Sequence, residues 1–385
     1  MAKIDELLQE LCPDGVEYVS LESILEYEQP GKYIVKNTEY NDLYTVPVLT
    51  AGKSFLLGYT NETSGVYEAS STKPTIIFDD FITSFHWVDF PCKVKSSALK
   101  FIRPKNNDNV CFRYVYYQMC TINFVAKEHV RHWISVYSKF AIPLPPVPIQ
   151  QYIVEVLDTF TDAIGNLEEE LSLREKQFEY YREHLYQFDD ECSIKTIKDI
   201  SVKCFPGATP STKKPEYWQN GTIPWMSSGE IHQGQVKSIA GRITQLGYDS
   251  SSTKMVPINS IVVALAGQGK TRGTVAITRM ELCTNQSLCA IIPDQSMVVP
   301  EYLYFYLKGQ YFNLRQVSAG DGTRGGLNLK HIESYKVPVI SLDRQHKIVE
   351  ILDTFEAMIA NIKEEIALRT KQYEYYREKL LSFGK

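Results

Sequence analysis

The chain has no long hydrophobic run. Its 385 residues contain no apolar stretch close to the roughly 20 residues that a membrane-spanning helix needs. The first 20 residues include Asp5, Glu6, Glu10 and Asp14 and lack the apolar core of a secretory signal peptide, so we expect a cytoplasmic protein. Hydrophobic residues make up 44% and charged residues 23% of the chain, as in ordinary globular proteins, and the length predicts two or three domains.

Metal-binding patterns are also missing. The eight cysteines include no Cys-x-x-Cys pair and no zinc-ligand spacing, so we expect reduced, mostly buried thiols. His129 and His132 have no third ligand nearby in sequence, and we therefore predict no bound metal and a surface or DNA-contacting position for both. Asp79, Asp80 and Asp89 lack the acid-x-Lys core of a nuclease motif, so we assign these carboxylates to turns and packing.

No complete catalytic motif is present. Residues 264–271, Ala-Leu-Ala-Gly-Gln-Gly-Lys-Thr, satisfy a relaxed phosphate-loop pattern. A phosphate loop must lead into a helix, whereas residues 272–277 have the pattern of a second strand, which predicts a hairpin with a basic tip. Residues 320–326 fit Gly-x-Gly-x-x-Gly but follow a helical pattern rather than the strand that a dinucleotide site requires. No methyltransferase motif of the Asp-Pro-Pro-Tyr kind occurs.

What the chain does contain is a repeat. Residues 150–188 and 345–383 align without a gap at an offset of 195, and 23 of the 39 positions are identical. Both copies include the signature Glu-Tyr-Tyr-Arg-Glu, at 179–183 and at 374–378. Apolar residues recur in each copy at alternating steps of four and three, which is typical of a long helix that packs on a partner helix.

Two helices of equal length, each with the apolar seam that the other needs, most economically pack on each other. The predicted core of this helix pair comprises Leu157, Phe160, Ile164, Arg174 and Tyr181 in the first copy and Leu352, Phe355, Ile359, Arg369 and Tyr376 in the second. Arg174 and Arg369 interrupt the seam, which favours a register device or a contact with a partner. The alternative is that each helix lies separately on its own domain.

The net charge of −5 hides a segregation along the chain. Residues 93–139 carry nine cations and two anions, and residues 191–340 carry sixteen cations and ten anions. Residues 140–190, in contrast, carry three cations and eleven anions. A phosphate backbone responds to the local concentration of positive charge rather than to the total. The two blocks outside the helices therefore have a charge that suits nucleic-acid binding.

The repeat divides the chain into an N-terminal segment 1–19, a first block 20–147, a first helix 148–190, a second block 191–340 and a second helix 341–385. The first block has short β-rich runs between turn formers, which predicts a mixed α/β domain, and the second contains a run of turns and polar loops with tryptophans. The two blocks open alike, with Leu21 and Ile24 in the first block and Ile197 and Ile200 in the second. Beyond these residues the two sequences diverge completely.

These features resemble the specificity subunits of Type I restriction-modification systems over nearly the whole chain. The resemblance rests on the repeated helices, on their Ile142-Pro143 and Val337-Pro338 entries, and on residues 207–212, 223–225 and 285–286 of the second block. The first block lacks the Thr-Pro-Ser-Thr and Ile-Pro-Trp signatures, which indicates a different type of recognition domain. Contact residues therefore cannot be carried from one block to the other.

The resemblance implies two α/β target recognition domains separated by two long helices, which form an antiparallel coiled coil with pseudo-twofold symmetry. Each domain would read one half of a split target in double-stranded DNA. Two methyltransferase subunits would dock on the helices, bind S-adenosylmethionine and methylate adenine after flipping it from the duplex. Restriction subunits would use ATP and Mg for translocation and cleavage, so this chain itself would be no enzyme and would bind no cofactor.

The predicted DNA contacts are mainly polar and basic residues on turns of both blocks, because arginine and lysine pair with guanine edges and phosphates. They are Lys53, Arg131, His132, Thr212, Lys213, Gln268, Lys270, Thr271, Arg272 and Arg324. Two alternatives stay open for the whole chain. One is an NTPase that uses Lys270 and Thr271, and the other is a coiled-coil scaffold that binds only protein.

Overall fold

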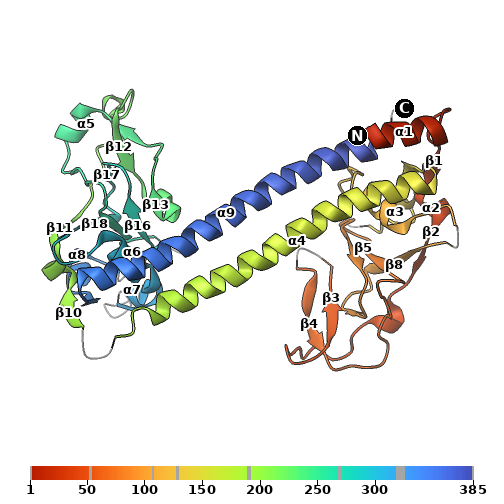
Figure 1. Cartoon of the computed structure of the whole chain (residues 1–385), viewed down its shortest axis with the longest axis horizontal. Helices are drawn as coiled ribbons and strands as arrows, with labels where there is room; N and C mark the ends of the chain where they lie inside the picture. Colours follow the sequence, from red (N-terminus) through yellow and green to blue (C-terminus); the bar gives the residue numbers. More distant parts are fainter. Residues whose placement is uncertain are drawn as a thin grey trace. The chain divides into compact units, whose positions relative to one another are not determined.

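The chain folds into two compact units (Figure 1). The computed structural model describes residues 2–51, 54–105, 108–126, 130–188, 192–267, 271–317 and 326–383. Unit 1 contains Met1–Asn166 and Ile366–Lys385, and unit 2 contains Leu167–Glu365. The boundary runs through the two longest helices, α4 (Val147–His184) and α9 (Leu342–Leu381), so each unit holds a part of both helices.

The two long helices pack antiparallel within each unit. In unit 1 the ring of Phe160 stacks on Tyr376 with centroids 5.2 Å apart, and in unit 2 Tyr181 stacks on Phe355 at the same distance. These contacts are equivalent, because the offset of 195 converts Phe160 to Phe355 and Tyr181 to Tyr376. A second contact in unit 2 is the 2.8 Å ion pair between Lys363 and Glu175. Lys363 follows Phe355 along α9, whereas Glu175 precedes Tyr181 along α4, so the two helices run in opposite directions. The predicted antiparallel pair is thus confirmed.

The two arginines of the predicted seam do not lie in its core. Arg174 is only half-buried and Arg369 is exposed, and each donates to the glutamine three residues later, Gln177 at 3.2 Å and Gln372 at 3.4 Å. Their long side chains reach water and bind along their own helix, so the prediction that they belong to the core is wrong. Tyr181 is also 41% exposed, although its ring stacks. The buried or half-buried seam residues are Leu157, Phe160, Ile164, Leu352, Phe355, Ile359 and Tyr376.

The first block builds a four-stranded and a three-stranded sheet in unit 1. The first sheet has the antiparallel order β2 (Leu25–Glu28), β8 (Leu99–Pro104), β5 (Thr75–Asp79) and β6 (Phe85–Val88). The second has the order β4 (Leu56–Thr60), β3 (Val46–Leu49) and β7 (Lys93–Val94), with β3 and β7 parallel. Helix α3 (Phe112–Met119) packs on the first sheet, and β1 (Tyr18–Ser20) pairs with β9 (Ala141–Pro143) where the chain enters and leaves the block.

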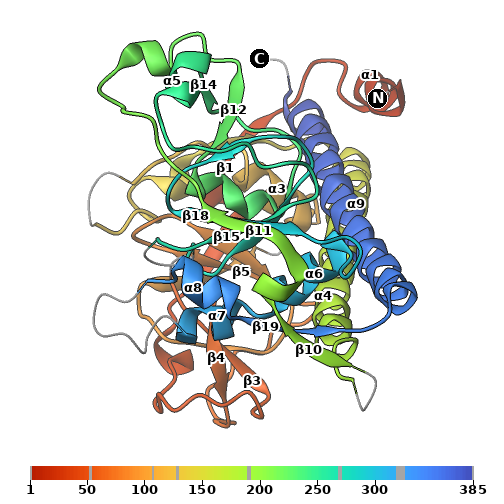
Figure 2. The same ribbon diagram turned by 90° about the vertical axis from the view of Figure 1, so that its left-hand side faces the viewer.

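The second block builds a five-stranded and a three-stranded sheet in unit 2. Its main sheet has the order β11 (Ser201–Pro206), β18 (Leu288–Pro293), β15 (Ile261–Ala264), β16 (Val275–Thr278) and β13 (Gln235–Val236), and Figure 2 shows the first three side by side. The smaller sheet has the order β14 (Arg242–Ile243), β12 (Ile223–Met226) and β17 (Cys283–Thr284), with β12 and β17 parallel. Helix α6 (Pro300–Gly309) packs on the main sheet, and β10 (Ser193–Thr196) pairs with β19 (Lys336–Val339).

Short helices complete both units. They are α1 (Ala2–Leu11), α2 (Leu21–Ile24), α5 (Gln245–Asp249), α7 (Tyr311–Val317) and α8 (Leu329–Glu333). The 3-10 turns are η1 (Gly31–Tyr33), η2 (Tyr137–Lys139), η3 (Ile197–Ile200), η4 (Pro215–Tyr217) and η5 (Ser228–Gln233). Helix α1 closes unit 1, because its Ile4 is buried in a cluster with Leu380 and Leu381 at the end of α9. Within the described part of the chain, no helix combines the length and the apolar character needed to cross a membrane.

The two blocks share one topology although their sequences diverge. The order β2-β8-β5-β6 matches β11-β18-β15-β16, and the parallel pair β3-β7 matches β12-β17. Both blocks therefore hold a central hairpin, β5-β6 or β15-β16, at the same place in the sheet. The two blocks thus differ in their loop signatures but share the strand order of their sheets. Positions can consequently be compared between the blocks by topology.

A buried glutamine of the helix repeat anchors each block. The Gln150 Oε1 accepts the N–H of Cys111 at 2.8 Å, and the Gln345 Oε1 accepts the N–H of Val299 at 2.8 Å. Both glutamines are fully buried, and each Nε2 also donates to a backbone carbonyl five residues earlier, Pro145 at 2.6 Å and Ile340 at 2.8 Å. Since these bonds go to backbone atoms, they leave the block sequence free to vary.

Candidate nucleic-acid interface

Three loops of the second block are joined in unit 2. The tip of the β15-β16 hairpin meets loop 285–287, because the N–H of Leu265 donates to the Ser287 carbonyl at 2.8 Å. Loop 285–287 meets the loop after β11 through a hydrogen bond from the Thr209 hydroxyl to the Gln286 side chain. The predicted residues Thr212, Lys213, Thr271 and Arg272 lie on this connected set of loops. Thr212 and Lys213 are exposed, and Thr271 and Arg272 are half-buried.

The loop that carries Thr212 and Lys213 is fixed at several points. The indole N–H groups of Trp225 and Trp218 donate to the carbonyls of Ala208 (3.0 Å) and Ser211 (3.2 Å). A Cβ on Gly207 would lie 2.2 Å from the Thr284 carbonyl oxygen, so only glycine fits there. The hydrogen bond from Lys214 to the Tyr217 hydroxyl (3.0 Å) raises the pKa of Lys214 and keeps its charge. The loop therefore presents polar and basic side chains from a rigid frame.

The hairpin β15-β16 has the geometry that the sequence predicted for residues 264–277. Ile261 pairs with Ile277 and Val263 with Val275 in antiparallel register. The turn closes with a hydrogen bond from the Thr274 N–H to the Thr271 carbonyl at 3.0 Å. A strand follows this turn where a phosphate loop would require a helix. The geometry therefore argues against the NTPase alternative.

The corresponding loops of unit 1 are joined in the same way. At the tip of the β5-β6 hairpin, the N–H of Asp80 donates to the Ala98 carbonyl at 3.0 Å, as Leu265 does to Ser287. Arg131 lies on the adjoining segment and is exposed. His132 does not have the exposure that a DNA contact requires, because it is 6% exposed and its ring packs on Phe124 at 5.4 Å.

Some predicted contacts lie outside the described residues, namely Lys53, Gln268, Lys270 and Arg324, together with His129 and most of the glycine-rich run 320–326. The packing role predicted for Asp79 and Asp80 agrees with the structure. The Asp79 side chain accepts the N–H groups of Phe81 and Ile82, and the Asp80 carboxylate pairs with Lys100 at 3.1 Å. Across the described ranges, no group of three or more His, Cys, Asp or Glu residues is placed to hold a metal ion.

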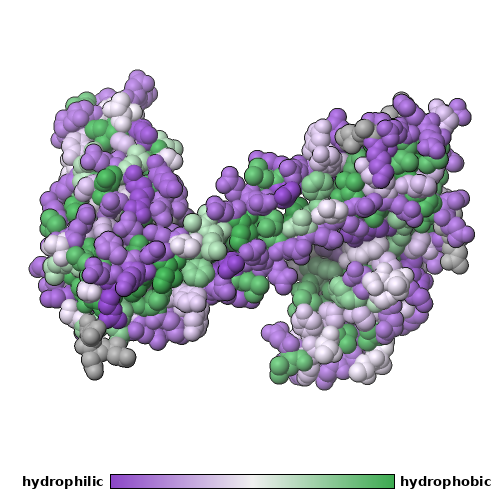
Figure 3. Space-filling model, viewed as in Figure 1, coloured by the Kyte–Doolittle hydropathy of each residue, from purple (hydrophilic) through white to green (hydrophobic). Residues whose placement is uncertain are grey.

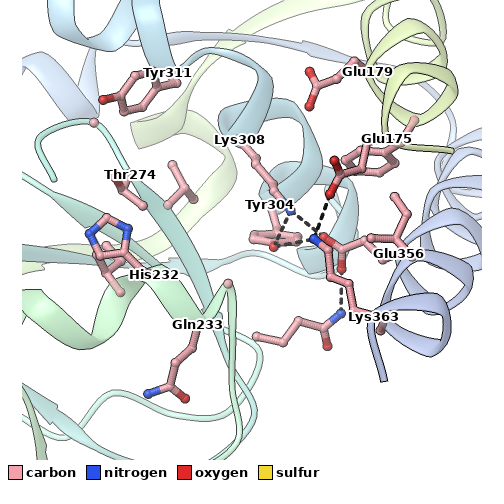
Figure 4. A pocket seen from close by; sticks show the side chains of 18 of the residues that line it. Glu175, Glu179, His232, Gln233, Thr274, Tyr304, Lys308, Tyr311, Glu356 and Lys363 are labelled. Atoms are coloured by element: carbon pink, nitrogen blue, oxygen red, sulfur yellow. Dashed lines mark hydrogen bonds and ion pairs between the residues drawn. The ribbon is translucent and has the colours of Figure 1, made fainter. Parts of the chain in front are cut away.

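Unit 2 also contains a cleft of about 970 Å³ beside the helix pair (Figure 4). It contains two ion pairs: Lys308 contacts Glu356 at 2.5 Å, and Lys363 contacts Glu175 at 2.8 Å. The Glu356 carboxylate also accepts from Gln235 at 3.1 Å, which ties β13 of the block to α9. Paired charges of both signs make this cleft a joint between block and helices rather than a site for an anion. No sequence motif marked these residues, because they meet only in the fold.

Apolar residues are exposed at equivalent positions of the two long helices. Leu173 and Leu368, which the offset of 195 relates, are each 54% exposed. Tyr180 and Tyr375 are likewise related and are 56% and 54% exposed. The space-filling view shows apolar residues among hydrophilic ones along the visible face of both helices (Figure 3). The repeat thus presents the same apolar residues twice, once in each unit.

Known proteins match this chain over its whole length. A family model described as the Type I restriction modification DNA specificity domain matches residues 13–173 and 190–368. The chain is 41% identical over 403 residues to the Type I restriction enzyme EcoR124I/EcoR124II specificity subunit of Escherichia coli, covering 100% of this chain and 98% of that protein. A putative type I restriction enzyme specificity subunit of Haemophilus influenzae is 27% identical, covering 71% of this chain and 72% of its own length.

Two solved structures share the fold. The S subunit of a Type-I restriction-modification system from M. genitalium matches with a TM-score of 0.66 and 14% identity, over 96% of this chain and 97% of that one. A chain from a structural study of complex assembly and conformational transition of the type I R-M system matches with a TM-score of 0.55 and 15% identity, over 96% and 98% of the two chains. At these identities the likeness concerns the fold alone.

Proposed function

The chain belongs to the family of Type I restriction-modification specificity subunits, and from this premise we propose that it selects a split target in double-stranded DNA. Each block reads one half of the target with the loops at the tip of its central hairpin. The bases between the two halves are not read. The long helices, which both units share, serve as the spacer between the two readers.

One observation carries this proposal: the two blocks share the strand order of their sheets but have different side chains on the equivalent loops. Both blocks place a hairpin tip against the loop before the last strand of the sheet, through Asp80 and Ala98 in unit 1 and through Leu265 and Ser287 in unit 2. The side chains on these loops differ between the blocks. Since direct readout depends on the side chains that reach base edges, two unlike half-sites follow.

The repeat suits two copies of one partner. Because the repeat recurs at an offset of 195, the exposed residues Leu173 and Tyr180 recur as Leu368 and Tyr375, which gives two docking surfaces of the same composition. Two methyltransferase subunits are the partners that the family suggests. They would bind S-adenosylmethionine and methylate adenine, and restriction subunits would supply ATP- and Mg-dependent translocation and cleavage. This chain would act with them in the cytoplasm as the non-catalytic subunit.

Methylation sequencing of DNA from cells that express the complete system tests the proposal. We expect one methylated motif made of two unlike half-sites separated by a fixed number of unspecified bases. The matched control is a strain without this chain, in which the motif should be unmethylated. A continuous palindrome, or methylation that persists without the chain, would contradict the proposal.

A further inference from the structure

The tip of the β5-β6 hairpin in unit 1 holds one apolar side chain in a fixed place. The Asp79 carboxylate accepts the N–H groups of Phe81 at 2.8 Å and Ile82 at 3.3 Å. Thr83 adopts a φ of +58°, a conformation that L-residues rarely take, and its N–H donates to the Asp79 carbonyl at 2.9 Å. Ile82 sits at the apex and is 53% exposed. A tight, closed turn thus presents a β-branched apolar side chain to the outside.

Asp80 joins this tip to a second segment. Its carboxylate accepts the N–H of Trp133 at 2.8 Å, and its carbonyl accepts the N–H of His132 at 2.8 Å. The same carboxylate pairs with Lys100 at 3.1 Å, and both side chains are 2% exposed. A buried ion pair with an additional hydrogen bond fixes its neighbours strongly, because breaking it would leave a buried charge without a partner. Arg131, the exposed residue before His132, is thereby held beside the hairpin tip.

A third element, the loop before β8, meets the tip and carries another cation. The N–H of Asp80 donates to the Ala98 carbonyl at 3.0 Å, so the loop before β8 also abuts the tip. Lys95, at the start of this loop, is exposed. We call Ile82, Lys95 and Arg131 the unit 1 tip surface. It consists of an apolar apex on the turn between two strands of the four-stranded sheet, with one cation on each of the two adjoining segments.

We propose that Ile82 of the unit 1 tip surface contacts the C5-methyl group of a thymine in the major groove, an inference that rests on the proposed function. The methyl group is the apolar feature that marks thymine in the major groove, and an exposed apolar side chain at the apex of a turn can contact it there. Lys95 and Arg131 contact the phosphates on either side, which positions the turn without reading sequence. Asp80 is a positioning residue that holds all three elements in one arrangement.

Replacement of thymine by uracil tests the contact, because it removes the methyl group and leaves the base-pairing edge unchanged. The binding of the complex of this chain with its methyltransferase subunits is measured on duplexes with single replacements in each half-site. One replacement in the unit 1 half-site should weaken binding about three- to fivefold, as expected for one buried methyl group. The Ile82→Ala variant should bind the thymine and uracil duplexes with equal affinity. Leu246→Ala, a change at a 54% exposed leucine of unit 2, should keep the full effect.

The outcomes separate this inference from the proposed function. If the complex binds its split target but no thymine shows coupling to Ile82, the contact does not exist although the function stands. If Ile82→Ala weakens binding equally on all duplexes, the residue supports a non-specific or protein contact, and the inference is wrong. If the complex binds no split target, the proposed function itself fails.

The positioning role of Asp80 has its own test. Asp80→Asn or Asp80→Ala alone would leave Lys100 buried without a counter-charge, so each is combined with Lys100→Met. Asp80→Asn/Lys100→Met keeps an oxygen for the Trp133 N–H and should retain the uracil effect. Asp80→Ala/Lys100→Met removes that oxygen and should lose the effect, while binding remains sensitive to changes in the other half-site. Retention of the effect in both double variants would overturn the positioning role, and the Ile82 test decides the contact independently.

Discussion

In units 1 and 2 the helix repeat places equivalent aspartates, Asp158 and Asp353, beside different blocks. In unit 1, Asp158 accepts from the Arg113 guanidinium at 2.9 Å and from the Tyr117 hydroxyl. The offset of 195 places Asp353 at the same point of the second helix. The backbone bonds of the two buried glutamines align Cys111 with Val299, and on that alignment Glu301 stands where unit 1 has Arg113. Unit 2 therefore puts a carboxylate where unit 1 puts a cation.

In unit 2, cations from other elements pair with the carboxylates near Asp353. Arg279, at the end of β16, contacts Glu301 at 2.6 Å, and Lys308 of α6 contacts Glu356 at 2.5 Å. Burial, together with the negative charges of Glu301 and Glu356, raises the pKa of Asp353, and Arg279 only partly opposes this effect. The helix repeat thus gives each block the same glutamine bonds to its backbone and places an aspartate beside it. The block brings its own neutralising residues, so blocks are exchangeable as whole domains.

The largest effect should come from placing the first block in both positions. Residues 194–340 are replaced by residues 18–145, whose ends match because Tyr18 pairs with Pro143 as Ile194 pairs with Pro338. Arg113 of the added block should then meet Asp353. We expect the second half-site to disappear and the target to become an inverted repeat of the unit 1 half-site, as methylation sequencing would record.

The reciprocal exchange is its control. A chain with the second block in both positions should recognise an inverted repeat of the other half-site. A folded double-block chain that still methylates the original asymmetric target would show that the blocks do not read the halves independently.

A smaller effect is expected from Gly207→Ala in unit 2. The new Cβ would lie 2.2 Å from the Thr284 carbonyl oxygen and 2.3 Å from that of Asn285, so backbone must move. We expect a loss of about 3 kcal/mol and a fall in Tm of roughly 6–12 °C, measured by calorimetry. Gly31→Ala is the matched control in unit 1, because a Cβ there meets open space. Equal stability of the two variants would show that the Gly207 contact is not tight.

Asp158→Asn should destabilise unit 1 by about 1–2 kcal/mol, measured by urea unfolding. The variant weakens the acceptor that Arg113 and Tyr117 share, and the partial exposure of the pair, 24% and 33%, limits the loss. A double-mutant cycle with Arg113→Met isolates the ion pair. A coupling energy near zero would mean that Asp158 is not the anchor of α3.

The sequence supports some of these conclusions better than others. The repeat is visible because the helices must present the same residues to each other, such as Phe160 and Tyr376 or their equivalents. The common topology of the blocks is not visible, because Gln150 and Gln345 hold them through backbone atoms that any sequence supplies. Burial of His132 and exposure of Arg369 could not be predicted either, because residue type alone does not fix which face a side chain occupies.

The smallest effect is expected at Asp353, the equivalent of Asp158 in the second helix. Its replacement should change the stability in the opposite direction to Asp158→Asn. Asp353→Asn removes a carboxylate whose pKa is raised in the folded state, so at pH 7 the variant should be more stable than the parent chain. The gain should be about 0.5 kcal/mol, or roughly 1–2 °C in Tm, because the group is only partly buried.

An acid with a raised folded pKa binds its proton more tightly when folded, so the parent chain recovers this difference as the pH falls through that pKa. The advantage of Asp353→Asn should therefore shrink between pH 7 and pH 4 and vanish below the ordinary pKa of aspartate. Tm measured across this range would contradict the comparison if Asp353→Asn, like Asp158→Asn, were destabilising at pH 7.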